Sequence, residues 1–382
     1  MAATVLTSLN FIDGEWRPAQ SGAIIQTHNP ADTRQLVAVY PLSDAADART
    51  AITAAVRAFP GWGGTTPVAR GRILSRTAQI LESRKGVLTE LLTREEGKTL
   101  GESGGEVQRA IDIFRFFGGL SYTVGGQTFP HDLPHNLLYT TRQPLGVVGL
   151  ITPWNFPIAI PAWKLAPALL AGNTVVLKPA TQAPGMSLEL ARALAEAGLP
   201  KGALNVVVGE GRSVGQELAT HADVVALSFT GSHAIGQVIY QQLAPRMARA
   251  QMEMGGKNPT IVLADADLDL AANLVIKAGF GLTGQACTAT SRVIVEKAVL
   301  EPFLERLVAR ARELKVGNGL SPGVEMGPAV SQAQLEIDLD YIRIAQAEGA
   351  RLVCGGQRLI EAEFAHGRSE EHTSELQSPN TI

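Results

Sequence analysis

The 382-residue sequence has only two cysteines, few aromatic residues and no surplus of positive charge. Two cysteines are too few for a disulfide framework, so we expect a reducing, cytoplasmic compartment. The net charge of −3, without a dense block of lysine and arginine, argues against binding to nucleic acid or to a membrane surface. The first ten residues also lack the basic start and apolar run of a signal peptide.

Long hydrophobic runs are almost absent. One uncharged stretch, residues 143–163, is long enough to cross a bilayer, but Pro144, Pro153, Pro157 and Pro161 interrupt it. Because proline breaks helical hydrogen bonding, we expect no membrane span. The composition, 45% hydrophobic and 18% charged, instead suits a globular protein with a large core and two or three domains.

The first part of the chain reads as scaffold. A hairpin with Asp-Gly at its turn is predicted at residues 11–16 and a strand at 36–40. Ser43 is the predicted cap of the first helix. Further helices are predicted at residues 68–84, 86–94 and 106–117.

From residue 145 onward, short apolar runs alternate with amphipathic helices, which predicts a doubly wound parallel sheet. The expected strands are 145–151, 174–177, 204–208 and 224–229, and the expected helices are 160–170, 187–197, 214–220 and 232–243. Such sheets bind ligands at the carboxyl ends of their strands.

A second, weaker α/β pattern has strands at 260–263 and 291–295 and helices at 268–278 and 301–314, and a short strand is predicted before it at 249–252. These patterns divide the chain into an α/β domain of residues 1–251 and a second of residues 252–367. Residues 368–382 are polar and aperiodic and look like translated adapter sequence, so they are excluded from fold reasoning.

Cys287 is the strongest candidate for chemistry. It lies in Gly284-Gln285-Ala286-Cys287-Thr288, among small residues and without nearby charge, as close approach of a substrate to a nucleophile requires. The alternative is a small buried apolar residue. Cys354 fits only that second role.

Two further candidates follow predicted strands. In Thr152-Pro153-Trp154-Asn155-Phe156-Pro157, the prolines fix a turn, so the Asn155 amide is suited to donate to an oxyanion. The alternative is a rigid loop in which Asn155 satisfies its own backbone. Lys178, at the end of the next strand, is within reach of a ribose or phosphate, or is simply a solvated lysine.

Glycine-rich turns supply the next candidates. Thr230-Gly231-Ser232 joins a strand to a helix whose N-terminus favours phosphate, although an ordinary serine-capped turn has the same sequence. Residues 209–215 have the spacing G-x-G-x-x-x-G and favour a turn into a helix over a phosphate loop. Glu253, beside two glycines, is suited to activate water as a general base, or is a surface carboxylate near Lys257.

Together these motifs resemble the aldehyde dehydrogenases, from Phe11 to about Gly367. The resemblance rests on residues 153–157, Lys178, residues 229–232, residues 253–257 and residues 284–287, including the 34-residue interval between Glu253 and Cys287. It implies an aldehyde dehydrogenase-like α/β fold with a cofactor domain and a catalytic domain.

The resemblance also implies the chemistry. Cys287 forms a thiohemiacetal, Asn155 and the Cys287 backbone N–H hold the oxyanion, and Glu253 activates the water that hydrolyses the thioester. Lys164 is implied as a proton relay, with a structural lysine as the alternative. No metal is expected.

NADP or NAD is the implied cofactor. Thr181 occupies a position where the family often has a glutamate that repels a 2′-phosphate, so we expect NADP to be accepted or preferred. The implied cofactor-binding residues are Ile151, Pro153, Trp154, Lys178, Ala180, Thr181, Gly215, Phe229, Thr230, Gly231, Ser232, Ile235, Met254 and Gly255.

Family members continue well past Gly367. We therefore expect an incomplete catalytic domain, an exposed sheet edge, poor folding and little turnover from this chain. A hairpin at about residues 121–142 corresponds to the family's oligomerisation element, which implies a homodimer or homotetramer.

Within the family, residues 158–169, 287–292 and 338–342 look like 2-oxoglutarate-semialdehyde (2,5-dioxopentanoate) dehydrogenases. Succinate semialdehyde is the alternative substrate, and Arg115 and Arg292 are candidates for binding an anionic aldehyde. Two other classes stay open, a cofactor-independent thiol esterase and a catalytically inactive binding or assembly protein.

Overall fold

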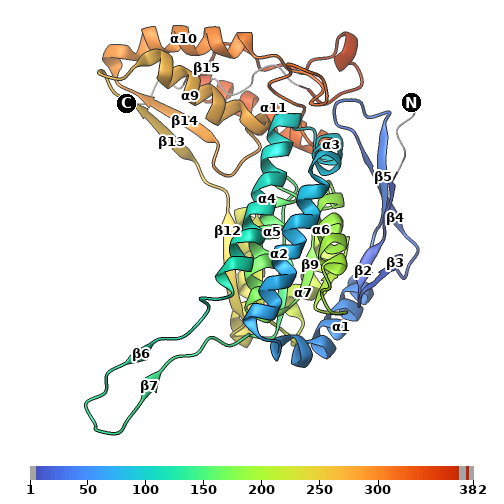
Figure 1. The fold of residues 1–382 in the computed structure, drawn as a ribbon. Helices are drawn as coiled ribbons and strands as arrows, with labels where there is room; N and C mark the ends of the chain where they lie inside the picture. The colour runs from blue at the N-terminus through green and yellow to red at the C-terminus, as the bar shows by residue number, and fades with distance from the viewer. Residues whose placement is uncertain (1–5, 370–375, 378–382) are drawn as a thin grey trace.

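A seven-stranded sheet organises the computed structural model, which describes residues 6–369 and 376–377 (Figure 1). Its strand order is β12-β11-β8-β9-β10-β2-β3. The five parallel strands are β8 (Val147–Ile151), β9 (Thr174–Lys178), β10 (Leu204–Val206), β11 (Val224–Gly231) and β12 (Arg249–Met254). The expected doubly wound α/β fold is confirmed.

The predicted hairpin is present as β2 (Asn10–Ile12) and β3 (Glu15–Arg17). Asp13 and Gly14 both have positive φ, 56° and 76°, as a type I′ turn requires. The sequence did not predict where the hairpin goes. It extends the main sheet, because β2 pairs antiparallel with β10.

Helices cover both faces of this sheet (Figure 1). One face packs against α2 (Pro67–Ser83), α4 (Leu100–Leu120), α5 (Ala159–Leu170) and α6 (Gly185–Glu196), and the other against α1 (Ala45–Gly63), α7 (Gln216–Thr220) and α8 (His233–Leu243).

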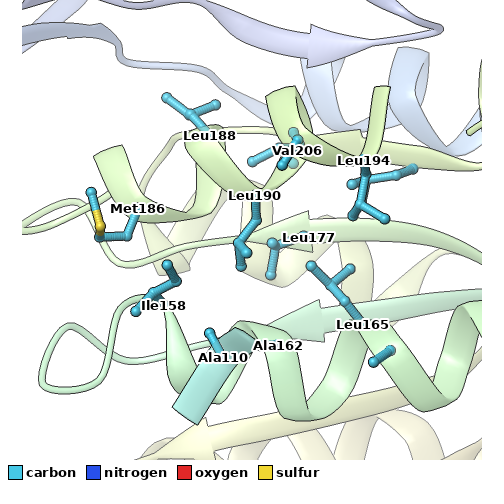
Figure 2. Close-up of a cluster of buried hydrophobic side chains, with 14 of the residues drawn as sticks. Ala110, Ile158, Ala162, Leu165, Leu177, Met186, Leu188, Leu190, Leu194 and Val206 are labelled. Carbon is cyan, nitrogen blue, oxygen red and sulfur yellow. The ribbon is translucent and has the colours of Figure 1, made fainter. Parts of the chain in front are cut away.

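Alternation along the strands divides the core between these faces. In β8, Val148 and Leu150 join the first cluster, whereas Val147 and Ile151 join the second. Figure 2 shows part of the first cluster, in which Leu177 of β9 packs with side chains of α5 and α6. The carboxyl ends of β8 and β9 are therefore held between two packed layers.

The predicted cap of the first helix is wrong by one residue. Asp44 is the N-cap of α1, and its side chain accepts from the backbone N–H groups of Ala46 and Asp47. The Ser43 hydroxyl instead accepts a 2.7 Å hydrogen bond from Asn10 in the core. The Ser43 hydroxyl, which local sequence preference would use to cap the helix, is therefore used in a tertiary hydrogen bond instead.

Other element bounds differ from the sequence predictions. α4 begins at Leu100 rather than residue 106, and β12 continues to Met254, so Glu253 lies within the strand. Residues 211–215 form a π-helical turn that leads into α7, which confirms the predicted turn into a helix. The remaining N-terminal elements are β1 (Leu6–Thr7), β4 (Ile24–His28), β5 (Leu36–Pro41) and α3 (Lys85–Glu96).

A second α/β unit follows β12, at one end of α4 (Figure 1). Its parallel strands β13 (Asn258–Val262) and β14 (Thr290–Val295) pack with α9 (Leu268–Phe280) and α10 (Leu300–Glu313) around Val262, Val275 and Phe303. Cys354 is half-buried against this cluster. α11 (Gln332–Ala347) follows, and the short strand β15 (Arg351–Leu352) pairs antiparallel with β16 (Leu376–Gln377). A domain boundary at residue 251 stays a prediction, and most of the predicted tail, 368–382, lies outside the described residues.

The expected hairpin at residues 121–142 contains β6 (Thr128–Phe129) and β7 (Leu138–Tyr139), and it extends away from the body of the protein (Figure 1). Its large apolar side chains, including Phe129, Leu138 and Tyr139, are exposed. No helix within residues 6–369 or 376–377 is both long and apolar enough to cross a lipid bilayer.

Candidate active site

A cavity of about 670 Å³ brings Cys287 and Glu253 together. It lies beside α5 and the β8, β11 and β12 strands, and Lys164 and Thr230 also contribute to its wall. Most of the remaining lining is apolar and includes Leu150, Ile160, Trp163, Ala226 and Leu227. The predicted nucleophile and the predicted base therefore face the same apolar space.

Cys287 follows a strained turn. After α9, Leu282 and Thr283 have φ angles of 56° and 57°, in the left-handed region that residues other than glycine rarely adopt. The Leu282 backbone N–H donates to Glu102 at 2.6 Å, and the Thr283 hydroxyl donates to the carbonyl of Gly327 at 3.0 Å. These bonds hold the turn in a conformation that costs about 1 kcal/mol or more per residue.

The Cys287 side chain is exposed and unpaired with the other cysteine, so it is not a buried packing residue. Its carbonyl oxygen accepts from the Asn258 amide at 2.9 Å. Its backbone N–H has no acceptor within the described chain. The thiol and a free N–H donor are therefore available at the same residue.

Asn155 lies beside this turn. Its Nδ2 donates to the carbonyl of Gln285 at 2.7 Å, across 130 residues of sequence. Its second amide N–H has no acceptor among the described residues. The alternative in which Asn155 satisfies its own backbone is therefore wrong. An oxyanion needs fixed donors of this kind, one from a side chain and one from the backbone.

Glu253 is held by a line of hydrogen bonds. Its Oε1 accepts from Gln251 Nε2 at 2.6 Å, and Gln251 Oε1 accepts from Lys164 Nζ at 3.2 Å. Lys164 Nζ also donates to Ser228 Oγ at 2.5 Å. Among the described residues no ion pair joins Glu253 to Lys257.

Lys164 is 9% exposed. Burial lowers the pKa of its ammonium to about 8, although the Glu253 carboxylate acts in the opposite direction. A lysine whose pKa is lowered this far by burial gives up its proton more readily than an exposed lysine, and such shifts are common at functional sites. Gln251 connects it to the candidate base.

Beyond the cavity, the parallel sheet has a topological switch point between β8 and β11, because β9 lies on one side of β8 and β11 on the other. Ile151 and Phe229 are register partners across this junction. Pro153 and Trp154 follow the first strand, and Gly231 ends the second. Ligands of doubly wound sheets bind in the crevice at such a point.

The start of α8 fits a phosphate. Ser232 is its N-cap, but the side chain makes no capping hydrogen bond, so the first-turn N–H groups are left for an anion. A Cβ at Gly231 would lie 2.5 Å from the Phe229 ring, so only glycine fits there. Thr230 and Ile235 flank this helix start, and Ile235 is exposed.

Lys178 is 5% exposed, so the solvated-lysine alternative is wrong. Its Nζ donates to the carbonyls of Pro179 at 2.8 Å and Gly209 at 3.1 Å. A third N–H has no acceptor among the described residues and is free for a ligand hydroxyl. Burial lowers the pKa of this ammonium to about 8, with Glu210 acting in the opposite direction. The α8 N-terminus and Lys178 thus provide donors for the phosphates and the ribose of a dinucleotide.

Residues 16–371 match the profile described as "Aldehyde dehydrogenase family". The chain belongs to the aldehyde dehydrogenase family. It is an oxidoreductase that oxidises an aldehyde with NAD or NADP, as the resemblance implied.

Curated relatives and solved structures support the same family assignment. An alpha-ketoglutarate semialdehyde dehydrogenase of Haloferax volcanii is 51% identical over 349 residues, 91% of this chain and 72% of the relative. An alpha-ketoglutaric semialdehyde dehydrogenase of Bacillus subtilis is 46% identical over 94% of this chain and 74% of its own length. The structure of betaine aldehyde dehydrogenase from Staphylococcus aureus in complex with NAD+ has a TM-score of 0.93 and 33% identity, over 96% and 73% of the two chains.

The aldehyde dehydrogenase site includes neither of the two predicted anion-binding arginines. Arg115 pairs with Glu82 on the outside of α4, and Arg292 is an exposed residue of β14, so neither lines the cavity. Arg249 does line it. Other predicted cofactor residues lie near the crevice in half-buried or exposed positions, namely Ala180, Thr181, Met254 and Gly255, whereas Gly215 is buried beside Lys178.

Three contributors to this aldehyde dehydrogenase site were missed from the sequence: Gln251, Ser228 and Glu102. Gln251 had a detectable signal, because it lies two residues before Glu253 in a strand and so shares its face. Glu102 had none, because its contact to Leu282 spans 180 residues. Among the described residues no three His, Cys, Asp or Glu side chains gather as a metal-binding group.

Proposed function

We propose that this aldehyde dehydrogenase oxidises 2-oxoglutarate semialdehyde to 2-oxoglutarate, with Cys287 as its nucleophile. The observation that carries the site assignment is the meeting of Cys287 and Glu253 in one cavity, with Asn155 bonded to the residue two positions before the cysteine. The substrate assignment is supported by two relatives named for this semialdehyde, at 51% and 46% identity. Succinate semialdehyde is the second candidate.

In the first half of the reaction, the Cys287 thiolate attacks the aldehyde carbon and forms a thiohemiacetal. The resulting oxyanion accepts hydrogen bonds from Asn155 Nδ2 and from the Cys287 backbone N–H. Both donors are fixed before the substrate arrives, so little reorganisation is needed when charge develops. When bound, a nicotinamide would supply the acceptor for the hydride that leaves the substrate carbon, and Cys287 would then hold the acyl group as a thioester.

In the second half, Glu253 takes a proton from water, the water oxygen attacks the thioester carbon, and Cys287 leaves as a thiolate. A thioester suits this step because it accepts water more readily than an oxygen ester. Gln251 orients the Glu253 carboxylate, and Lys164 orients Gln251. Lys178 would hold the adenosine ribose of the cofactor, and the α8 N-terminus, with Gly231 and Ser232, would hold its pyrophosphate.

The wider organisation is part of the proposal. Residues 1–251 form the cofactor domain and residues 252–367 belong to the catalytic domain. The exposed apolar hairpin at 121–142 joins subunits in a homodimer or homotetramer, and the enzyme works in the cytoplasm. Analytical ultracentrifugation of a variant with Leu138 and Tyr139 replaced by serine tests the hairpin, because a loss of the oligomer is expected.

The test of function follows the absorbance of the reduced cofactor with 2-oxoglutarate semialdehyde and with succinate semialdehyde, each with NADP and NAD. The same assay tests the prediction of little turnover, which a kcat in the ordinary enzymatic range would contradict. Cys287→Ser should abolish turnover. Glu253→Gln should release a single burst of reduced cofactor and then stop, because the thioester forms but is not hydrolysed. Absence of the burst would remove Glu253 from hydrolysis, and a higher kcat/KM for succinate semialdehyde would replace the substrate. Ester hydrolysis without aldehyde turnover would favour the thiol esterase.

A further inference from the structure

The start of α4 carries a buried ion pair that does not touch the cavity. The side chains of Lys98 and Glu106 are 1% and 2% exposed, and Lys98 Nζ lies 2.7 Å from Glu106 Oε2. Burial by itself lowers the pKa of Lys98, but the carboxylates of Glu96 and Glu106 outweigh it and the pKa is raised. Lys98 is therefore charged at neutral pH, deep inside the protein.

This pair holds the backbone of the Asn155 loop. Lys98 Nζ donates to the main-chain carbonyl of Asn155 at 2.7 Å, and it lies 4.9 Å from the centroid of the Phe156 ring. Glu106 Oε1 accepts from the backbone N–H groups of Ile158 and Ala159 at 3.0 and 3.1 Å. The loop is therefore fixed at Asn155 itself and at its exit into α5.

Glu106 also completes α5. That helix begins at Ala159, and its N-cap residue Ile158 supplies no capping side chain. Helix starts leave backbone N–H groups without partners, and a carboxylate there is favoured by both hydrogen bonding and the helix dipole. Glu106 of α4 is thus the cap of α5, and Ile158 is buried against Ala110 of the same α4 (Figure 2).

The same helix end holds the Cys287 turn. Glu102 Oε1 accepts from the Leu282 backbone N–H at 2.6 Å, while Glu102 Oε2 accepts from Thr99 at the start of α4. Leu282 has a left-handed backbone that needs such support. The first two turns of one rigid helix therefore contact both loops, and these loops carry the oxyanion donor and the nucleophile.

From these contacts we infer that Lys98 and Glu106 are positioning residues for aldehyde oxidation, which place the Asn155 carboxamide relative to Cys287 without touching the substrate. This inference rests on the proposed role of Asn155. A buried ion pair is a weak source of net stability, whereas its hydrogen bonds fix three backbone positions. A misplacement of a reacting group by about 1 Å can lower a rate by about a hundredfold.

The experiment compares Lys98→Met and Glu106→Gln with Glu95→Gln. Glu95 is a matched control, because it is equally buried and accepts from the backbone N–H of Gly185 at the start of α6, yet it contacts neither loop. We expect Lys98→Met and Glu106→Gln to lower kcat by about tenfold to a hundredfold. The Kd for the cofactor should be unchanged in both, and Glu95→Gln should keep the wild-type kcat.

The Asn155→Ala variant shows how much kcat depends on the Asn155 side chain. The double variant with Lys98→Met shows whether Lys98 acts through that side chain. If Lys98 acts through Asn155, Lys98→Met should have little further effect on kcat in the Asn155→Ala background. If Asn155→Ala itself keeps the wild-type kcat, the proposed role of Asn155 fails. If Asn155→Ala is slow but Lys98→Met is not, only the positioning role fails.

Two other results overturn the inference: an equal loss from Glu95→Gln, or an undiminished effect of Lys98→Met in the Asn155→Ala background. If Lys98→Met does not fold, the triple variant Lys98→Met/Glu96→Gln/Glu106→Gln takes its place, because it also neutralises both buried carboxylates that pair with Lys98, and the same loss of kcat is expected.

Discussion

Replacing Lys178 by methionine should weaken cofactor binding and, at pH 7, stabilise the protein. Burial lowers the pKa of this lysine from 10.5 to about 8, which corresponds to about 3 kcal/mol. Below pH 8 the side chain is protonated in both the folded and the unfolded state, so the folded state bears this full cost. As pH rises from 8 towards 10.5, the folded state releases its proton first and stability recovers.

The substitution also removes two hydrogen bonds, to the carbonyls of Pro179 and Gly209. Each is worth about 1 kcal/mol. The net gain at pH 7 is therefore about 1 kcal/mol, or a Tm higher by roughly 2 °C for a chain of this size. The gain should shrink at pH 9.5, where the wild-type protein no longer carries most of the cost.

Function should change in the opposite direction. A hydrogen bond from an ammonium to a ligand is worth about 1.5–3 kcal/mol, so the Kd for the cofactor should rise about tenfold to a hundredfold. Fluorescence titration measures the Kd and circular dichroism the melt, with Lys297→Met, an exposed lysine, as the control. An unchanged Kd would remove Lys178 from the ribose site. A lower Tm at pH 7, or a gain that does not shrink at pH 9.5, would refute the burial argument.

Three further predictions concern selectivity, pH and packing. Thr181→Glu should lower kcat/KM for NADP about tenfold or more while that for NAD is kept, because a carboxylate repels the 2′-phosphate; equal losses for both cofactors in initial-rate assays would contradict this. Burial raises the pKa of Glu95 from 4.5 to about 7, so its contribution to stability is present below pH 4.5 and is lost as pH rises through 7. The wild-type Tm should therefore fall from pH 5 to pH 8, and Glu95→Gln should flatten that slope. Gly327→Ala should destabilise by about 1–3 kcal/mol in urea melts, because its Cβ would lie 2.2 Å from the carbonyl oxygen of Gly97. Gly105→Ala, in open space on α4, should be neutral or stabilising, and similar losses from both would show that the close contact is not the cause.

Local signals in the sequence were sufficient for most of the sheet. The apolar run at 147–151 and the Asp13-Gly14 turn were both predicted correctly, because each depends on neighbours in the chain. The pairing of β2 with β10 was not predictable, since nothing local marks a partner about 190 residues away. Ser43 failed as a cap for a related reason: Asn10 takes its hydroxyl.

Site residues were also predictable only where the signal is local. Cys287, Glu253 and Lys178 lie in short motifs, so they could be predicted from the sequence. Lys98 and Glu106 could not be predicted as site residues. Charged side chains in or next to a helix are usually exposed to solvent, and only the fold buries this pair. The hydrogen bond between Asn155 and Gln285 could not be predicted from the sequence either, although both residues belong to recognised motifs.

The register of β11 and β12 has a consequence for how such a chain can change in length. Thr230 is the direct partner of Glu253, so main-chain pairing ties the base to the strand that leads into the phosphate-binding turn. One residue inserted or deleted within β12 would turn Glu253 to the opposite face of the sheet. Residues 244–248 lie outside both strands and can absorb such a change. Insertions and deletions that preserve activity should therefore accumulate in that connection, while the two strands keep their lengths.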